Sequence, residues 1–117
     1  MKDARDMNRK HRRRKTLVLL NVISADLPEK AARAAVIDIS LGGSAFETSQ
    51  EFSKDEALFM RFILPGERVY TVKARVVRVS RSGGAFTYGA QFERLGFFSR
   101  MKLRRVISDI SRTRRPH

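Results

Sequence analysis

Two groups of polar residues have the types and the spacing to bind a charged nucleotide. One is the hexapeptide Asp38-Ile-Ser-Leu-Gly-Gly43, and the other is an arginine-rich run at residues 9–15. Arginine can bind phosphate and the O6/N7 edge of guanine, and a carboxylate can accept the N–H groups on the opposite guanine edge. A hydroxyl can add a hydrogen bond, and glycine lets a base approach the backbone. Together they suggest a site for a guanine nucleotide with more than one phosphate.

The positive charge of the chain is concentrated at its two ends. The 117 residues have a formal net charge of +13. Residues 1–15 hold eight basic and two acidic residues, a net +6, and residues 100–117 hold seven and one, again +6. The body between them carries only +1. This distribution fits a general polyanion binder, and it also fits a small anion site served by a basic arm.

Composition excludes several other classes of site. The length fits one domain, and 42% hydrophobic residues are enough for one core. The chain has no cysteine, and its two histidines, His11 and His117, lie in the charged ends, so we expect no metal site and no disulfide. The apolar run at residues 17–20 is too short for a signal peptide or a membrane span. We therefore expect a cytoplasmic protein without membrane insertion.

Six apolar segments separated by turn residues predict β-strands. The clearest is the fifth, where Val72, Ala74 and Val76 alternate with polar residues. The predicted strands cover residues 17–23, 34–39, 44–48, 57–64, 69–79 and 86–92. After Gly96 the apolar spacing becomes helical, and Ser99 could cap that helix. The fold class expected is all-β (mainly β): a six-stranded antiparallel β-barrel with a C-terminal α-helix.

The chain divides into three parts by composition. Residues 1–15 have almost nothing to bury, so they predict a flexible basic N-terminal arm. Residues 16–112 form the expected barrel and helix, and residues 113–117 are expected to be a frayed tail. The apolar stripe of the helix is expected to pack on the barrel, so a monomer is favoured over a dimer.

With these elements in place, the chain resembles the PilZ domain family. The signature of that family is Arg-x-x-x-Arg near the start, followed by Asp/Asn-x-Ser-x-x-Gly. Residues 9–13 supply the first motif, and Asp38, Ser40 and Gly43 occupy the defined positions of the second. The segment Tyr-Gly-Ala-Gln-Phe at residues 88–92 also resembles the family's last strand. The resemblance covers nearly the whole chain and implies a stand-alone PilZ protein that binds cyclic di-GMP in bacteria.

The resemblance assigns the arginines of the arm to the ligand. Arg9 and Arg13 would clamp a phosphate and guanine O6/N7, with Arg14 as a helper. Because the tract is rich in arginine, Lys10 with Arg14 and Arg5 with Arg9 also satisfy the spacing. Arginine has the planar fork that reads guanine bidentately and lysine does not, so the Arg9/Arg13 register is preferred over one that starts with lysine.

The resemblance assigns the second motif to the guanine. Asp38 would accept from N1–H and N2–H, Ser40 would supply a further hydrogen bond, and Gly43 would hold the turn and allow close approach. On residue types alone, the same hexapeptide also fits a strand that ends in a side-chain-stabilised turn.

The function implied is that of a cyclic di-GMP receptor, not an enzyme, with no cofactor besides this ligand. Its arm would change conformation on binding and relay the signal to a protein partner, for example in motility or surface behaviour. Whether one or two ligands bind stays open. Two alternatives remain: a non-specific nucleic-acid binder with basic tails, and a PilZ-like scaffold that ignores nucleotide. Five acidic residues of the body are expected to be solvated loop or strand-edge charges without a catalytic role: Glu47, Glu51, Asp55, Glu56 and Glu67.

Overall fold

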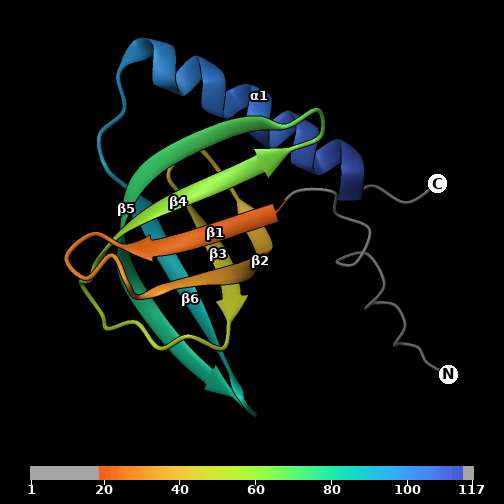
Figure 1. The fold of residues 1–117 in the computed structure, drawn as a ribbon. Coiled ribbons are helices and arrows are strands. Elements are labelled where there is room, and N and C mark those ends of the chain that lie inside the picture. Colours follow the sequence, from red (N-terminus) through yellow and green to blue (C-terminus); the bar gives the residue numbers. More distant parts are fainter. Residues whose placement is uncertain (1–18, 115–117) are drawn as a thin grey trace, which may run out of the picture.

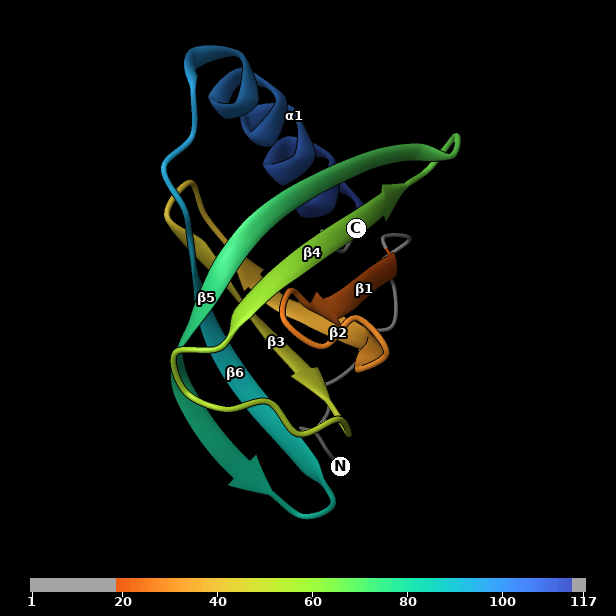
Figure 2. The same ribbon diagram turned by 60° about the vertical axis from the view of Figure 1, so that its left-hand side comes forward.

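The computed structural model describes residues 19–114, which form six strands and one helix (Figures 1 and 2). All strand pairs are antiparallel, and they close a barrel in the order β1-β2-β3-β6-β5-β4. The predicted mainly-β barrel with a C-terminal helix is therefore confirmed. The predicted arm at residues 1–15 lies outside the described residues, as do residues 115–117. The elements are β1 (Leu19–Ser24), β2 (Ala31–Ile39), β3 (Gly43–Thr48), β4 (Ala57–Leu64), β5 (Arg68–Ser82), β6 (Ala85–Phe92) and α1 (Phe97–Arg114).

The boundaries differ from the predicted ones at three places. β2 begins three residues earlier than predicted, because residues 31–33 pair with β1 although their side chains show no strong apolar pattern. β5 extends to Ser82, since its last residues pair with β6 up to the turn. The helix begins at Phe97, so Ser99 lies inside it and is not its cap.

The barrel interior is filled by alternate residues of the strands. The large and apolar side chains that are fully buried on the strands are Leu20, Val22, Phe46, Leu58, Met60, Phe62, Ala74, Val76 and Tyr88. The Tyr88 hydroxyl accepts from the Phe52 N–H (2.7 Å) and donates to the Gln50 carbonyl (2.9 Å). These bonds tie the loop between β3 and β4 to the core, because the polar end of a buried tyrosine needs partners.

The helix covers β5 and the adjoining end of β4 (Figure 1). Leu103, Val106 and Ile110, spaced along one helix face, are buried in the same core cluster as the barrel residues. At the start of the helix the Tyr70 hydroxyl donates to the Ser99 carbonyl (3.3 Å). Further along, Arg68 forms an ion pair with Asp109 (2.9 Å), so the helix is held on the barrel by apolar and polar contacts together.

Glu56 is engaged in a partly buried hydrogen-bond network, contrary to the expectation that it is a solvated charge. Its carboxylate accepts from the Ser24 hydroxyl (2.7 Å), the Ser53 N–H (2.8 Å) and the Lys30 ammonium (3.2 Å). Burial raises the pKa of the Glu56 carboxyl, but these hydrogen bonds and the Lys30 charge lower it by more, so it lies below its ordinary value of 4.5. The network joins β1, its following turn and the start of β4.

The Glu56→Gln variant tests this network through pH. A lowered folded-state pKa means that the carboxylate contributes stability above the ordinary pKa, and that this contribution is lost as pH falls through the folded value. We expect the variant to reduce the free energy of unfolding by about 1–2 kcal/mol at neutral pH. The difference from the parent should shrink as pH falls below 4.5. Urea unfolding over a pH series measures it, with exposed Glu29→Gln as control; a difference independent of pH contradicts the assignment.

Gly43, the first residue of β3, packs directly against the main chain of β6. A Cβ atom at this position would collide with the carbonyl oxygen of Ala90, whereas a Cβ at the neighbouring Gly42 would make an ordinary contact, 3.9 Å from the Ser40 hydroxyl. Only glycine fits at position 43, because the obstacle is main chain and cannot rotate away.

The two glycines of this turn therefore give a matched pair of variants. We expect Gly43→Ala to lower the free energy of unfolding by about 1–3 kcal/mol, because β3 and β6 must separate to admit the methyl group. Gly42→Ala should change stability little. Thermal unfolding of both variants beside the parent measures this, and equal stability of the two would refute the steric argument.

Candidate functional site

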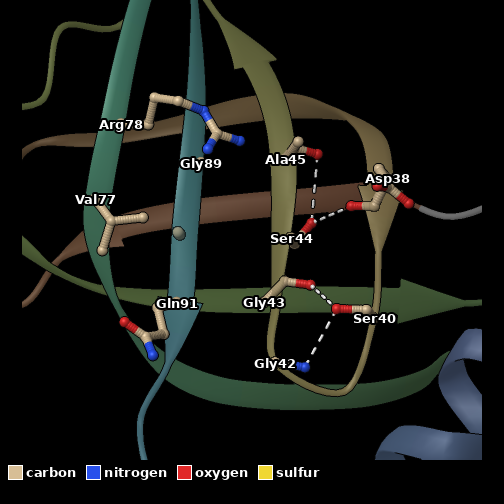
Figure 3. Close-up of a pocket in the computed structure, with 11 residues that line it drawn as sticks. Asp38, Ser40, Gly42, Gly43, Ser44, Ala45, Val77, Arg78, Gly89 and Gln91 are labelled. Atoms are coloured by element: carbon tan, nitrogen blue, oxygen red, sulfur yellow. Dashed lines mark hydrogen bonds between the residues drawn. The ribbon is translucent and has the colours of Figure 1, made fainter.

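The predicted hexapeptide forms the end of β2, a tight turn and the start of β3 (Figure 3). The Ser40 N–H donates to the Gly43 carbonyl (2.8 Å), and the Ser40 hydroxyl accepts from the Gly42 N–H (3.2 Å). The same hydroxyl lies 3.4 Å from the Gly43 carbonyl oxygen, at the limit of a hydrogen bond. Ser40 therefore stabilises the turn through its side chain, as the simpler interpretation of the motif predicts. Its side chain is still exposed and accessible to a ligand.

A β-bulge in β2 places Asp38 on the outside of the barrel. Val36 pairs with Phe46, but Asp38 pairs with Ala45, so Ile37 is an extra residue in the ladder. In a regular strand, Asp38 would point inward like Val36, two residues before it. The extra residue reverses the alternation, and Asp38 is exposed where Val36 is buried.

A second bulge, in β5, does the same for Arg78. Val76 pairs with Ala90, but Arg78 pairs with Gly89, so Val77 is the extra residue. Without it, Arg78 would follow Val76 into the core. With it, the Arg78 side chain lies outside and crosses β6 at Gly89, where a Cβ atom would be 3.0 Å from a guanidinium nitrogen (Figure 3). A side chain at position 89 would therefore push the guanidinium out of place.

The two bulges and the strand order bring these residues into one row across four strands. Asp38 pairs with Ala45, Ala45 with Gly89, and Gly89 with Arg78. At about 4.8 Å between neighbouring strands, the two outer Cα atoms are roughly 14 Å apart. Both middle residues are small: the Arg78 guanidinium covers Gly89, and Ala45 forms a shallow floor between that guanidinium and the Asp38 carboxylate.

This row crosses a surface cavity of about 360 Å³, a volume typical of small-molecule sites. Ser40 and Gly43 lie at its β2–β3 end, and Gln91 of β6 completes the lining beside Val77. Among residues 19–114, none forms a hydrogen bond or ion pair with the carboxylate of Asp38 or with the guanidinium of Arg78. Both groups are therefore available to a ligand that carries donors on one edge and acceptors on another.

Three of the predicted site residues, Asp38, Ser40 and Gly43, line this one cavity. The other three, Arg9, Arg13 and Arg14, lie outside the described residues.

Arg78 and Gln91 were missed by the sequence reasoning. A signal for Arg78 existed, since Val76-Val77-Arg78 breaks the period of two in an otherwise alternating strand. Its position opposite Gly89 follows only from the pairing of β5 with β6.

Neither a metal centre nor a membrane span is found in the described part of the chain. No cluster of three or more histidine, aspartate or glutamate side chains among residues 19–114 could hold an ion. The single described helix is not long and apolar enough to cross a membrane.

Comparison with known proteins finds similar solved structures. Comparison with curated proteins finds no match. Among solved structures, the PilZ domain of YcgR from Escherichia coli with c-di-GMP is similar at a TM-score of 0.67 and 17% identity, over 82% of this chain and 83% of that one. The PilZ domain of CeSA from a cellulose-synthesizing bacterium matches at a TM-score of 0.59 and 18% identity, over 78% and 89% of the two chains. MrkH from K. pneumonia in its apo state matches at 0.61 and 16%, over 80% of this chain and 46% of its own.

These structural likenesses establish the fold, and the sequence comparison adds the family. The PilZ domain family model matches residues 7–109, a range that includes the arginine motif, the Asp38–Gly43 turn, all six strands and most of the helix. With that match over most of its length, the chain belongs to the PilZ domain family.

Proposed function

We propose that this chain is a receptor for cyclic di-GMP, a ligand that PilZ domains typically bind, and that the ligand occupies the cavity between Asp38 and Arg78. The observation that carries the proposal is the row across β2, β3, β6 and β5, with an acceptor at one end and a donor fork at the other. Guanine has the complementary pattern: N1–H and N2–H donors on one edge, O6 and N7 acceptors on another.

Each residue of the row has a role toward one guanine. Asp38 accepts from N1–H and N2–H, with the Ser40 hydroxyl beside it. The guanine ring lies over Ala45, between the Asp38 carboxylate and the Arg78 guanidinium, which covers Gly89. Arg78 donates to O6/N7 or stacks on the base, because its guanidinium lies next to Gly89 at the edge of the cavity.

The phosphates need cations that the cavity does not supply. Among its described lining residues, the charged side chains are Asp38 and Arg78, which sum to zero. A ligand with two phosphates therefore calls for the arm, and we propose Arg9 and Arg13 for this role, with Arg14 as helper.

The arm is long enough to reach the cavity. Leu20 on β1 pairs with Ala34 on β2. Ala34 is four residues before Asp38, a distance of about 13 Å along the strand. Arg13 is six residues before Leu19, so an extended chain carries it up to about 20 Å from that strand.

Arm closure is the step that we propose as the signal. A basic arm that is loose without ligand and docked with it presents two different surfaces to a protein partner, an order–disorder switch. Ordering the arm has an entropic cost, which the phosphate contacts must exceed. Control of motility or surface behaviour is the kind of output this would serve, and the nucleotide is the only small ligand required.

Calorimetric titration with cyclic di-GMP tests the site. We expect Asp38→Ala, Arg78→Ala and Arg13→Ala each to weaken binding by about one to two orders of magnitude, the value of one bidentate contact. The matched control is Arg61→Ala on β4, an exposed arginine outside the cavity that removes the same charge. Absence of binding heat with the parent protein would refute the receptor proposal. Equal affinity of the parent and all variants would refute only the assignment of the binding residues.

The same titration separates a receptor from a polyanion binder. A site that reads guanine through Asp38 should prefer cyclic di-GMP to cyclic di-AMP, and its affinity should fall moderately with salt. Binding that ignores the base and collapses steeply with ionic strength indicates the nucleic-acid alternative.

Hydrogen exchange with and without cyclic di-GMP tests the switch. We expect amides of residues 5–15 to gain protection when ligand is bound, and the Arg9→Ala/Arg13→Ala variant to lose that gain. Amides of β5 should change little and serve as an internal control, because that strand is already paired on both sides. Equal exchange of residues 5–15 in both states contradicts arm closure and leaves binding itself untouched.

A further inference from the structure

The outward face of α1 exposes three large apolar side chains at the start of the helix. Phe97 is 71% exposed, Phe98 79% and Met101 50%. The two phenylalanine rings contact each other edge to face, with centroids 5.5 Å apart. Exposed apolar residues are ordinary when scattered singly, but a contiguous group indicates a contact surface.

Helical spacing directs this group away from the barrel. Leu103, Val106 and Ile110 form the buried face. At about 100° per residue, Phe97 and Met101 project from the opposite side, and Phe98 lies at its margin. The apolar group is therefore not a loosened part of the core, and it packs on no described part of the barrel.

Cations flank the apolar group on both sides. On one side of it lie Arg100 and Arg104, on the other lies Lys102, and Arg105 follows one turn after Met101; all four are exposed. A shallow groove of about 250 Å³ lies between Phe98, Met101, Lys102 and Arg105. The one acidic residue of the helix, Asp109, is paired with Arg68 on the barrel side. The face that a partner would contact is therefore positively charged.

The positive charge of this helix face discriminates between the partners that could bind it. A second copy of the chain, or its own basic arm, would bring like charges together, so both are disfavoured. An anionic surface is complementary. The phenylalanine rings are largely exposed, and the groove beside them is shallow and lined by flexible side chains. Such a surface suits a fluid that deforms around the rings better than a protein partner of fixed shape.

We propose that this face of α1 binds the surface of a membrane that contains anionic lipid. Phe97, Phe98 and Met101 enter the boundary between headgroups and acyl chains, and the four cations bind lipid phosphates on either side. Apolar residues on one face with Lys/Arg beside them is the arrangement of helices that lie in the interface without crossing it. The proposal uses no residue of the nucleotide cavity, so it stands or falls independently of the receptor proposal.

Tryptophan reporters test the contact directly, because the chain has no tryptophan of its own. Phe98→Trp in the full chain is mixed with vesicles of phosphatidylcholine and phosphatidylglycerol, or of phosphatidylcholine alone. We expect a blue shift of emission, and quenching by brominated acyl chains, with the mixed vesicles only. Phe59→Trp, at an exposed position of β4 on the barrel, is the matched control and should show neither.

Cosedimentation with vesicles separates the contribution of apolar insertion from that of charge. The basic arm is unchanged in every variant, so differences in binding between variants report the apolar side chains. Phe97→Ser/Phe98→Ser should weaken binding to the mixed vesicles by at least about tenfold, because two apolar side chains no longer leave water. Leu27→Ser/Phe59→Ser removes two exposed apolar residues elsewhere and should leave binding unchanged. Unshifted Trp emission at position 98, or equal binding of the two double variants, overturns the proposal, and so does a parent protein that fails to sediment with the vesicles.

Discussion

The alternation of side chains along a strand is the constraint on which this site depends. In a closed barrel every second residue must fill the interior, so a charged residue two positions after a core valine would be buried. Asp38 and Arg78 both stand at that position. One extra residue in each strand, Ile37 and Val77, turns them outward, and the order β2-β3-β6-β5 then aligns them across the same four strands. A β-bulge is a small irregularity, yet here two of them place both charged side chains of the cavity.

Small residues connect the stability of the barrel with the shape of the site. Gly43 has no room for a side chain because the Ala90 carbonyl lies against it, and Gly89 leaves the space that the Arg78 guanidinium fills. Ser40 likewise serves both the fold and the site, since its hydroxyl accepts a hydrogen bond within the turn and is exposed at the cavity. Residues of a binding motif can thus be required by the fold before any ligand is present, and their effect on binding has to be separated from their effect on folding.

The net charge of the protein lies almost entirely in its two ends and not in the barrel. The body is nearly neutral, and the described cavity balances one carboxylate with one guanidinium. The surplus cations lie in the arm at residues 1–15 and along α1. In the receptor that we propose, the neutral cavity selects the base and the arginines of residues 9–14 supply the affinity for phosphate. On the helix, cations beside exposed phenylalanines make a different surface, suited to an anionic interface.

Local pattern was enough to predict some features of this protein. Periods of two and of 3.6, punctuated by Gly, Pro and Ser turns, predicted six strands and a helix in the right order, because burial of one face imposes those periods. The Asp38–Gly43 turn could also be predicted, since its hydrogen bonds join residues that are close in sequence. The tertiary structure alone decided what lies opposite that turn. Arg78 is 40 positions away in the sequence, and only the pairing of β3 with β6 and β6 with β5 brings it to the same cavity. Glu56 was misread for the same reason, because one of its partners, Ser24, is 32 positions away. Which charges meet is set by strand order and register, and these emerge only when the barrel closes.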